Sequence, residues 1–111
     1  MEKISYDQEN DILYLNKGKK VQDSLDIGNL FLEFSGKNNI VGVEILNASK
    51  TVSELTGNDT TAEELENVKD AKIKMIPDND TVFIVLKLRI AKGEEVTEES
   101  INLNFSSQAL A

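Results

Sequence analysis

The sequence of 111 residues contains no cysteine and no histidine. The first absence excludes disulfide bonds, thiolate metal sites and cysteine nucleophiles. The second removes the commonest general base near neutral pH and the commonest metal ligand, and it excludes a Ser-His-Asp triad. Any chemistry would have to use carboxylates, Lys, Arg, Tyr or hydroxyl groups. The composition therefore argues against an enzyme, and we expect no catalytic residue, no metal and no cofactor.

Tryptophan is also absent, and the chain has only one proline and six glycines. So few breakers leave little room for long disordered segments. No apolar run approaches the roughly 20 residues that span a bilayer. The N-terminal residues lack the apolar stretch and cleavage site of a secretory signal. A chain of this length suits one modest core, so we expect a single cytoplasmic domain over residues 1–111 that does not contact a membrane.

The charge is strongly acidic, with a formal net charge of −8. Such an average field repels phosphate backbones unless the cations gather on one surface. Two groups of cations stand out: Lys17, Lys19 and Lys20 in one segment, and Lys72, Lys74, Lys87 and Arg89, which share faces of two expected strands. No aromatic residue alternates with either group, as single-stranded nucleic-acid binding would need. We therefore expect no direct nucleic-acid partner, and instead another protein or a second copy of the chain.

Alternating apolar residues in the first half predict short strands at 3–6, 11–16, 21–27, 30–34 and 40–46. The acidic, amide-rich segment 7–10 and the glycine-containing segment 35–39 predict hairpin loops. Gly42 lies inside an apolar strand, which indicates a bulge or the close approach of another backbone. Together these segments predict an antiparallel meander.

The period becomes helical after Ala48. Gly57 predicts the end of a first short helix. A second helix is predicted behind Thr60, because Thr60 and Glu63 have the capping-box spacing, and Leu65 and Val68 would give it an apolar stripe.

Strands return near residue 71, with a turn at 77–80, a long strand at 81–90, a final strand around 101–105 and a frayed tail at 106–111. The long strand has one continuous apolar face. Its other face changes from Phe83 and Val85 to Lys87 and Arg89, which predicts one covered end and one solvated end.

These segments predict an α+β fold, mainly antiparallel β-sheet built from meanders and hairpins, with one or two short helices at 49–69. The chain divides into a β-meander at 4–49, a helical connection at 50–69 and a second β unit at 70–106. Aligning Asn10-Asp11 with Asn79-Asp80 matches Tyr6 with Met75 and Leu13 with Val82, and it brings the apolar residues of 30–34 onto those of 101–105 once the second copy is allowed a longer strand. This match indicates either a degenerate repeat of a three-stranded unit or the generic similarity of hairpins.

Two separated sequence blocks carry a family resemblance. They are Tyr6-Asp7 followed by Asp11-Ile-Leu-Tyr14, and, after the Gly36 turn, Gly42-Val-Glu-Ile-Leu-Asn-Ala-Ser49. On these motifs, residues 4–49 resemble the family called domain of unknown function 2283, and the chain from Thr51 extends beyond it. The resemblance implies a small β-rich domain without an established activity. Some members of the family look like the antitoxin halves of toxin–antitoxin pairs.

Three carboxylates are candidate surface residues: Asp7, Asp11 and Glu44. Asp7, Glu9 and Asp11 alternate like the start of a calcium loop. However, the glycine and glutamate that such a loop needs at its sixth and twelfth positions are replaced by Ile12 and Gly18. These carboxylates are therefore predicted to form a turn. Glu44 lies between two apolar residues of a strand and faces either a cleft or solvent.

The first functional hypothesis is a non-enzymatic protein–protein interaction module that uses a sheet edge or an apolar face, including contact with a second copy as a homodimer. The alternatives are a small-ligand-binding module and an antitoxin-like component of a toxin–antitoxin pair. A carboxylate-based enzyme is the least favoured.

Overall fold

The computed structural model describes residues 1–36 and 39–110. In chain order the elements are β1 (Lys3–Asp7), β2 (Ile12–Asn16), β3 (Asp23–Ile27), β4 (Leu30–Phe34), β5 (Ile40–Ile45), α1 (Ala48–Thr56), α2 (Ala62–Leu65), β6 (Val68–Asp78), β7 (Thr81–Lys92), β8 (Glu95–Ser106) and the 3₁₀ helix η1 (Ser107–Leu110). Both helices fall where the sequence predicts them. The expected hairpin loop at 35–39 includes residues 37 and 38, which lie outside the described residues.

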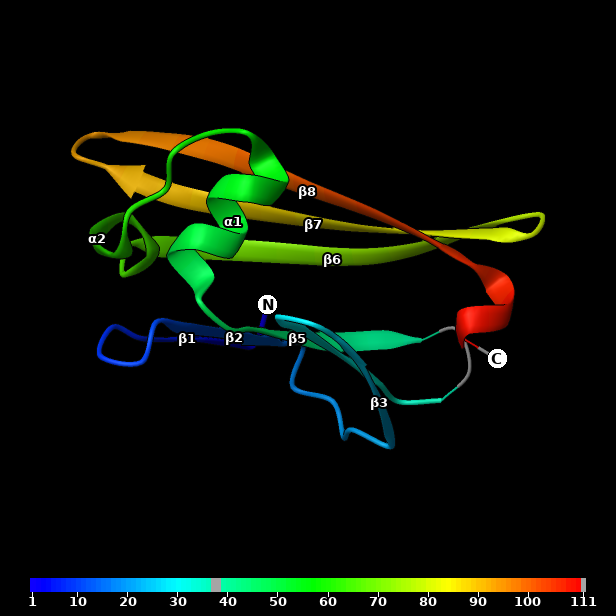
Figure 1. The fold of residues 1–111 in the computed structure, drawn as a ribbon. Helices are drawn as coiled ribbons and strands as arrows, with labels where there is room; N and C mark the ends of the chain where they lie inside the picture. The colour runs from blue at the N-terminus through cyan, green and yellow to red at the C-terminus, as the bar shows by residue number, and fades with distance from the viewer. Residues whose placement is uncertain (37–38, 111) are drawn as a thin grey trace.

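The strands form two sheets. The first sheet has the order β1-β2-β5-β4-β3 and the second sheet has the order β6-β7-β8. Every pairing is antiparallel. Figure 1 shows the sheets as two facing layers, with α1 lying along one side of the second sheet. The predicted α+β class with mainly antiparallel sheet is confirmed.

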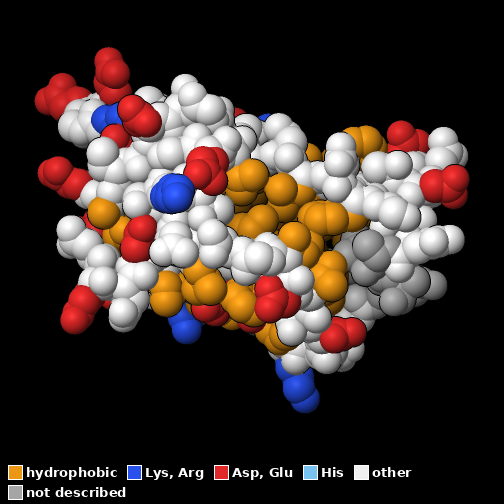
Figure 2. Space-filling view, in the orientation of Figure 1, with side chains coloured by type: hydrophobic (Ala, Val, Ile, Leu, Met, Phe, Trp, Pro, Cys, Tyr) orange, Lys and Arg blue, Asp and Glu red, His pale blue; other side chains and the backbone are white. Residues whose placement is uncertain are grey.

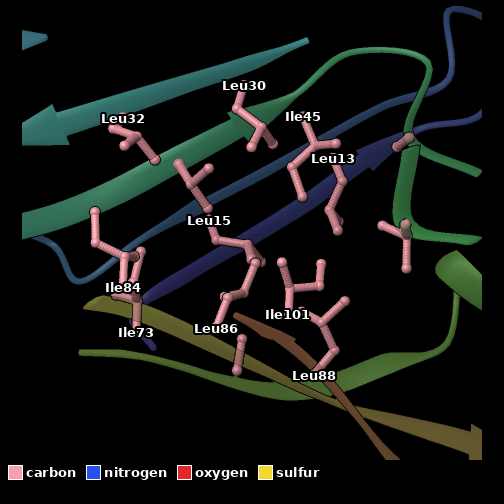
Figure 3. Close-up of a cluster of buried hydrophobic side chains, with 14 of the residues drawn as sticks. Leu13, Leu15, Leu30, Leu32, Ile45, Ile73, Ile84, Leu86, Leu88 and Ile101 are labelled. Carbon is pink, nitrogen blue, oxygen red and sulfur yellow. The ribbon is translucent and has the colours of Figure 1, made fainter. Parts of the chain in front are cut away.

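The core lies between the two layers. Leucine and isoleucine side chains from both sheets point toward one another in Figure 3: Leu13, Leu15, Leu30, Leu32 and Ile45 from the first sheet, and Ile73, Ile84, Leu86, Leu88 and Ile101 from the second. The alternating residues of β7 are buried as their period predicts. Each such side chain contributes about 2 kcal/mol through the burial of apolar surface. Figure 2 shows further apolar side chains gathered between the layers on the face that carries α1.

The two sheets are not copies of one three-stranded unit. In the second sheet β7 pairs with both β6 and β8, whereas β2 pairs with β1 and β5 and does not pair with β4 among the described residues. The hairpins also differ in register, because Tyr6 pairs with Leu13 while its aligned counterpart Met75 pairs with Ile84 rather than Val82. Aligned residues of the two hairpins point to the same side of their sheets, inward or outward, but they have different cross-strand partners. The strand order and register therefore give the repeat no support, and the alternation that all such strands share remains sufficient for the match.

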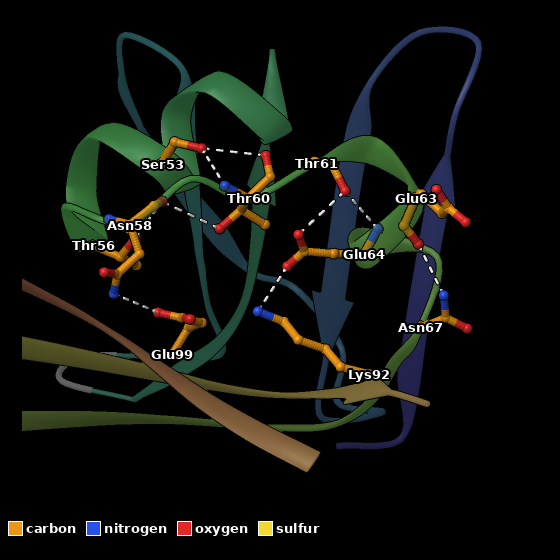
Figure 4. Close-up of polar contacts among 10 residues, drawn as sticks. All are labelled: Ser53, Thr56, Asn58, Thr60, Thr61, Glu63, Glu64, Asn67, Lys92 and Glu99. Atoms are coloured by element: carbon orange, nitrogen blue, oxygen red, sulfur yellow. Dashed lines mark hydrogen bonds and ion pairs between the residues drawn. The ribbon is translucent and has the colours of Figure 1, made fainter. Parts of the chain in front are cut away.

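The helical connection differs from the prediction by one residue. The cap of α2 is Thr61, whose hydroxyl accepts a hydrogen bond from the Glu64 backbone N–H at 3.1 Å. Thr60 is buried and instead donates its N–H to the Ser53 hydroxyl at 2.8 Å (Figure 4). Val68 belongs to β6, not to the apolar stripe of the helix. The capping-box spacing is present at both threonines, so sequence alone does not distinguish them.

Several strand boundaries also differ from the prediction, and the largest difference is in β8, which begins at Glu95 rather than near residue 101. β6 continues through Pro77 to Asp78, because an edge strand tolerates a residue without an N–H donor. The expected frayed tail contains η1, and the Ser107 N–H donates to the Asp80 carbonyl at 2.7 Å. No helix in the described part of the chain is both long and apolar enough to cross a membrane.

Candidate functional site

The outer face of the second sheet carries a groove of about 530 Å³. All of its lining comes from β6, β7 and β8: Asp70, Ala71, Lys72, Lys74, Ile76, Val85, Lys87, Arg89 and Glu98. The groove forms because the buried residues of these strands alternate with outward-facing polar and apolar residues. The four cations singled out in the sequence therefore do lie on one surface, which we call the basic groove.

The strand register sorts the outer face into cross-strand rows. The four rows are Asp70–Arg89–Glu98, Lys72–Lys87–Ser100, Lys74–Val85–Asn102 and Ile76–Phe83–Asn104. Successive rows are about 6.8 Å apart, since each advances two residues along a strand. Along the β6–β7 pair the first row combines a carboxylate with a cation, the second has two cations, the third has one cation beside a valine, and the fourth is apolar.

Two carboxylates of the basic groove already have cationic partners. The Lys87 ammonium lies 3.8 Å from Glu98 Oε1, and the Met1 amino group lies 3.6 Å from Asp70 Oδ1. The hydrogen bond from the Ala71 N–H, together with Met1 and Lys72, lowers the pKa of the Asp70 carboxyl. Among the described residues, Lys72, Lys74 and Arg89 form no ion pair within 4.0 Å. These three cations are available to an anionic ligand.

The apolar end of the outer face is open to solvent. Ile76 is 48% exposed and Phe83 is 36% exposed, and Val85 is half-buried. The prediction that the Phe83 end of β7 would be covered is therefore wrong. The strand period correctly separated the inward from the outward face, but periodicity does not show whether another layer packs on the outward one.

Asp11 is part of a polar clamp that ties the β1–β2 turn to α1. Its carboxylate accepts hydrogen bonds from the Tyr6 hydroxyl at 2.6 Å, from the Ser49 N–H at 3.0 Å and from the Ser49 hydroxyl at 2.7 Å. Its backbone carbonyl accepts from the Ala48 N–H at 2.8 Å. Asn47, the N-cap residue of α1, makes no side-chain capping bond. Asp11 therefore caps this helix from a distant turn.

The electrostatics of this clamp follow from those bonds. Burial alone would raise the pKa of the Asp11 carboxyl, but the hydrogen bonds from Tyr6 and Ser49 outweigh burial and lower that pKa. Burial and the hydrogen bond to Asp11 raise the pKa of the Tyr6 phenol. A carboxylate held in its charged form and a phenol held in its neutral form suit a structural contact better than proton transfer.

Asp7 and Glu44 do not join Asp11. Asp7 caps its own turn, accepting from the Asn10 N–H at 3.1 Å and from the Asn10 side-chain amide at 2.8 Å, which lowers the pKa of Asp7. Glu44 lies half-buried on the outer face of the first sheet, between its cross-strand neighbours Tyr14 and Phe31. Within the described residues, no group of three acidic side chains comes close enough to hold a metal ion.

A second polar cluster, on the outer face of the first sheet, has no counterpart among the sequence-based predictions. The Tyr14 hydroxyl donates to Glu33 Oε1 at 2.8 Å, and the Asn16 side-chain amide donates to the same oxygen at 3.2 Å. Burial and the hydrogen bond to Glu33 raise the pKa of the Tyr14 phenol. The residues come from β2 and β4, which are separated by β5. Only the order of strands brings them together, and no local signal in the sequence carries that order.

Comparison with known proteins finds a family match for the first half of the chain. Residues 3–49 match the family model described as protein of unknown function (DUF2283). An uncharacterized protein of Methanocaldococcus jannaschii is 45% identical over 49 residues, which cover 43% of this chain and 42% of that protein. This match thus spans less than half of the length of that relative. No solved structure matches the chain with comparable significance.

One relative aligns over nearly the whole chain. A protein of Methanosarcina mazei named putative hypoxanthine phosphoribosyltransferase is 26% identical over 117 residues, covering 97% of this chain and 90% of that protein. At this identity the name describes the relative alone. The resemblance expected from the Tyr-Asp and Gly-x-Glu blocks is confirmed, because residues 3–49 of this chain match the DUF2283 family model, and residues 50–111 lie beyond that match.

Proposed function

We propose that the chain is a non-enzymatic protein-interaction module that binds an acidic segment of a partner protein in the basic groove. One observation carries this proposal. In a chain with a net charge of −8, four cations gather in one groove, and the row of Lys74 adjoins the row of the exposed Ile76 and Phe83.

The two halves of this surface have complementary uses. Cations gathered on one patch attract an acidic segment and fix its position, while the rest of the acidic molecule repels it. Exposed apolar side chains supply affinity once they are covered by a partner. The groove offers both within about 20 Å, the distance across four rows at 6.8 Å per step. A partner segment would therefore need acidic and apolar side chains close together.

The same groove supports a second candidate, a small anionic ligand. A volume of about 530 Å³ lies in the range of ligand sites, and three cations have no ion-pair partner among the described residues. A screen of small anions by thermal denaturation would favour this candidate if one anion raised the midpoint and acidic peptides did not.

An antitoxin-like role would be a special case of protein interaction. A basic toxin would be repelled by Lys72, Lys74 and Arg89, so the basic groove gives that role no support. The glycines likewise give no support to the activity named for the Methanosarcina relative, because all six stand singly rather than in a phosphate-binding loop.

The proposal predicts that Lys72→Ala/Lys74→Ala weakens the binding of an acidic, leucine-containing peptide about tenfold, because removing two cations costs about 1–2 kcal/mol of attraction. Binding would be measured by titration at low salt, with backbone amide shifts locating the peptide on β6 and β7. The matched control is Lys17→Ala/Lys19→Ala, which removes the same charge from the loop between β2 and β3 and should bind as the unaltered chain does. Equal weakening in both variants, or shifts spread over the whole molecule, would contradict the proposal.

A further inference from the structure

We infer that the basic groove selects a partner segment by the order of its side chains, and this inference rests on the proposed function. The preferred segment has carboxylate side chains at its first and third positions and an apolar side chain at its fifth. The order comes from the rows of the outer face. Lys72 and Lys87 share one row, Lys74 and Val85 share the next, and Ile76 and Phe83 share the one after that.

An extended segment matches this spacing residue for residue. Its side chains on one face repeat every two residues, about 6.8 Å apart, which is also the distance between rows. A first carboxylate over the Lys72–Lys87 row places a second carboxylate over Lys74 and an apolar side chain over the Ile76–Phe83 row. Each side chain of such a segment meets a complementary group.

The reverse placement is unfavourable. A carboxylate over Ile76 and Phe83 would lose solvent contact without gaining a cation. An apolar side chain over Lys72 and Lys87 would cover charged groups that need solvent. Arg89 lies one row further from the apolar end, but it shares that row with Asp70 and Glu98, so the row offers an acidic segment no net attraction. Glu98 lies at that same end, 3.8 Å from Lys87, and discourages an acidic segment from sliding past the Lys72–Lys87 row.

A protein segment fits this surface better than a nucleic acid. A nucleic-acid strand needs cations along its whole backbone and aromatic side chains between them. Here the cations end at Lys74, and Phe83 is the one aromatic side chain in the four cross-strand rows. The net charge of −8 adds a repulsive field for any longer polyanion.

The test compares two peptides of the same composition on the full chain. One has the order Glu-Ser-Glu-Ser-Leu and the other Glu-Ser-Leu-Ser-Glu, both with capped ends. Moving the leucine to the centre removes the match in either chain direction. The inference predicts about tenfold tighter binding of the first peptide, and the loss of this difference in Phe83→Ser. Val96→Ser is the matched control, because Val96 is 50% exposed on the same sheet but pairs with Ala91, outside the four cross-strand rows.

The outcomes separate the inference from the proposed function. Equal binding of both peptides, with loss in Lys72→Ala/Lys74→Ala, would overturn the inference and leave the interaction module standing. Failure of both peptides to bind would overturn both. Tighter binding of a short oligothymidylate than of either peptide would overturn the proposal that the partner is a protein. A dimer seen by light scattering and lost in Phe83→Ser would also overturn it, since a second copy would then occupy the face.

Discussion

Gly42→Ala is expected to lower the free energy of unfolding by about 3 kcal/mol, at the upper end of the usual cost of overpacking. Gly42 lies in β5 opposite both Asn16 and Glu33. A Cβ atom there would collide with Glu33 Oε1 and would lie 2.8 Å from the Leu15 carbonyl oxygen and 2.9 Å from Asn16 Nδ2. The carbonyl belongs to a fully buried residue in the neighbouring strand and cannot move without breaking the sheet. Chemical denaturation of the two proteins measures the difference.

Gly93→Ala is the matched control for this effect. Gly93 has a φ of 65°, and no atom lies within 4 Å of the position that an added Cβ would take, so alanine there should cost only the left-handed backbone strain of about 1–2 kcal/mol. In the background of Glu33→Ala, Gly42→Ala should cost less than in the unaltered chain, because one of its three collisions is gone. A Gly42→Ala variant as stable as Gly93→Ala would show that the sheet adapts to the added methyl group.

Gly42 also shows what the sequence could predict about the fold. A glycine within an apolar strand predicted a bulge or a close backbone approach, and both are present. The register of β4 and β5 shifts at Glu33 and Phe34, and the Leu15 carbonyl approaches from the other side. The alternation of β7 likewise predicted which residues are buried. Local patterns of period two therefore located most strands and their inward faces.

The candidate site was less predictable, because it depends on the contacts between strands. The sequence showed that Lys72, Lys74, Lys87 and Arg89 share faces of two strands, but their rows depend on the β6–β7 register. The partners of Tyr14 depend on β5 returning between β2 and β4. The alignment of the two hairpins failed for the same reason. A turn sequence can match while the register differs by two residues and the faces stay the same.

The family motif has a structural explanation in the polar clamp. Tyr6, Asp11 and Ser49 come from the two separated blocks that carry the resemblance, and their side chains meet at one carboxylate. Asp11 has a φ of 54°, a left-handed conformation that aspartate tolerates better than most residues. The spacing within each block is thus explained by a turn and a helix start that contact each other. This role requires no ligand.

Asp11→Ala is expected to lower the free energy of unfolding by about 3 kcal/mol, since it removes the acceptor of three hydrogen bonds to a charged group and places alanine in a left-handed conformation. Tyr6→Phe and Ser49→Ala each remove part of the clamp and should cost about 1 kcal/mol. Asp7→Asn is the matched control, because Asp7 caps only its own exposed turn, and its effect should be much smaller. Equal effects at Asp7 and Asp11 would contradict the clamp.

The clamp also predicts how stability depends on pH. The folded-state pKa of Asp11 is lowered, so its contribution is fully present above the unfolded-state value of about 3.9 and is lost as the pH falls through the lower, folded-state value. Asp11→Asn has no charge to lose at this position. The difference in unfolding free energy between the unaltered chain and Asp11→Asn should therefore be constant from pH 7 to about pH 5 and should shrink below about pH 4. Denaturation curves at each pH measure this difference, and a difference that grows on acidification would show that the Asp11 carboxyl is protonated, not charged, in the native clamp.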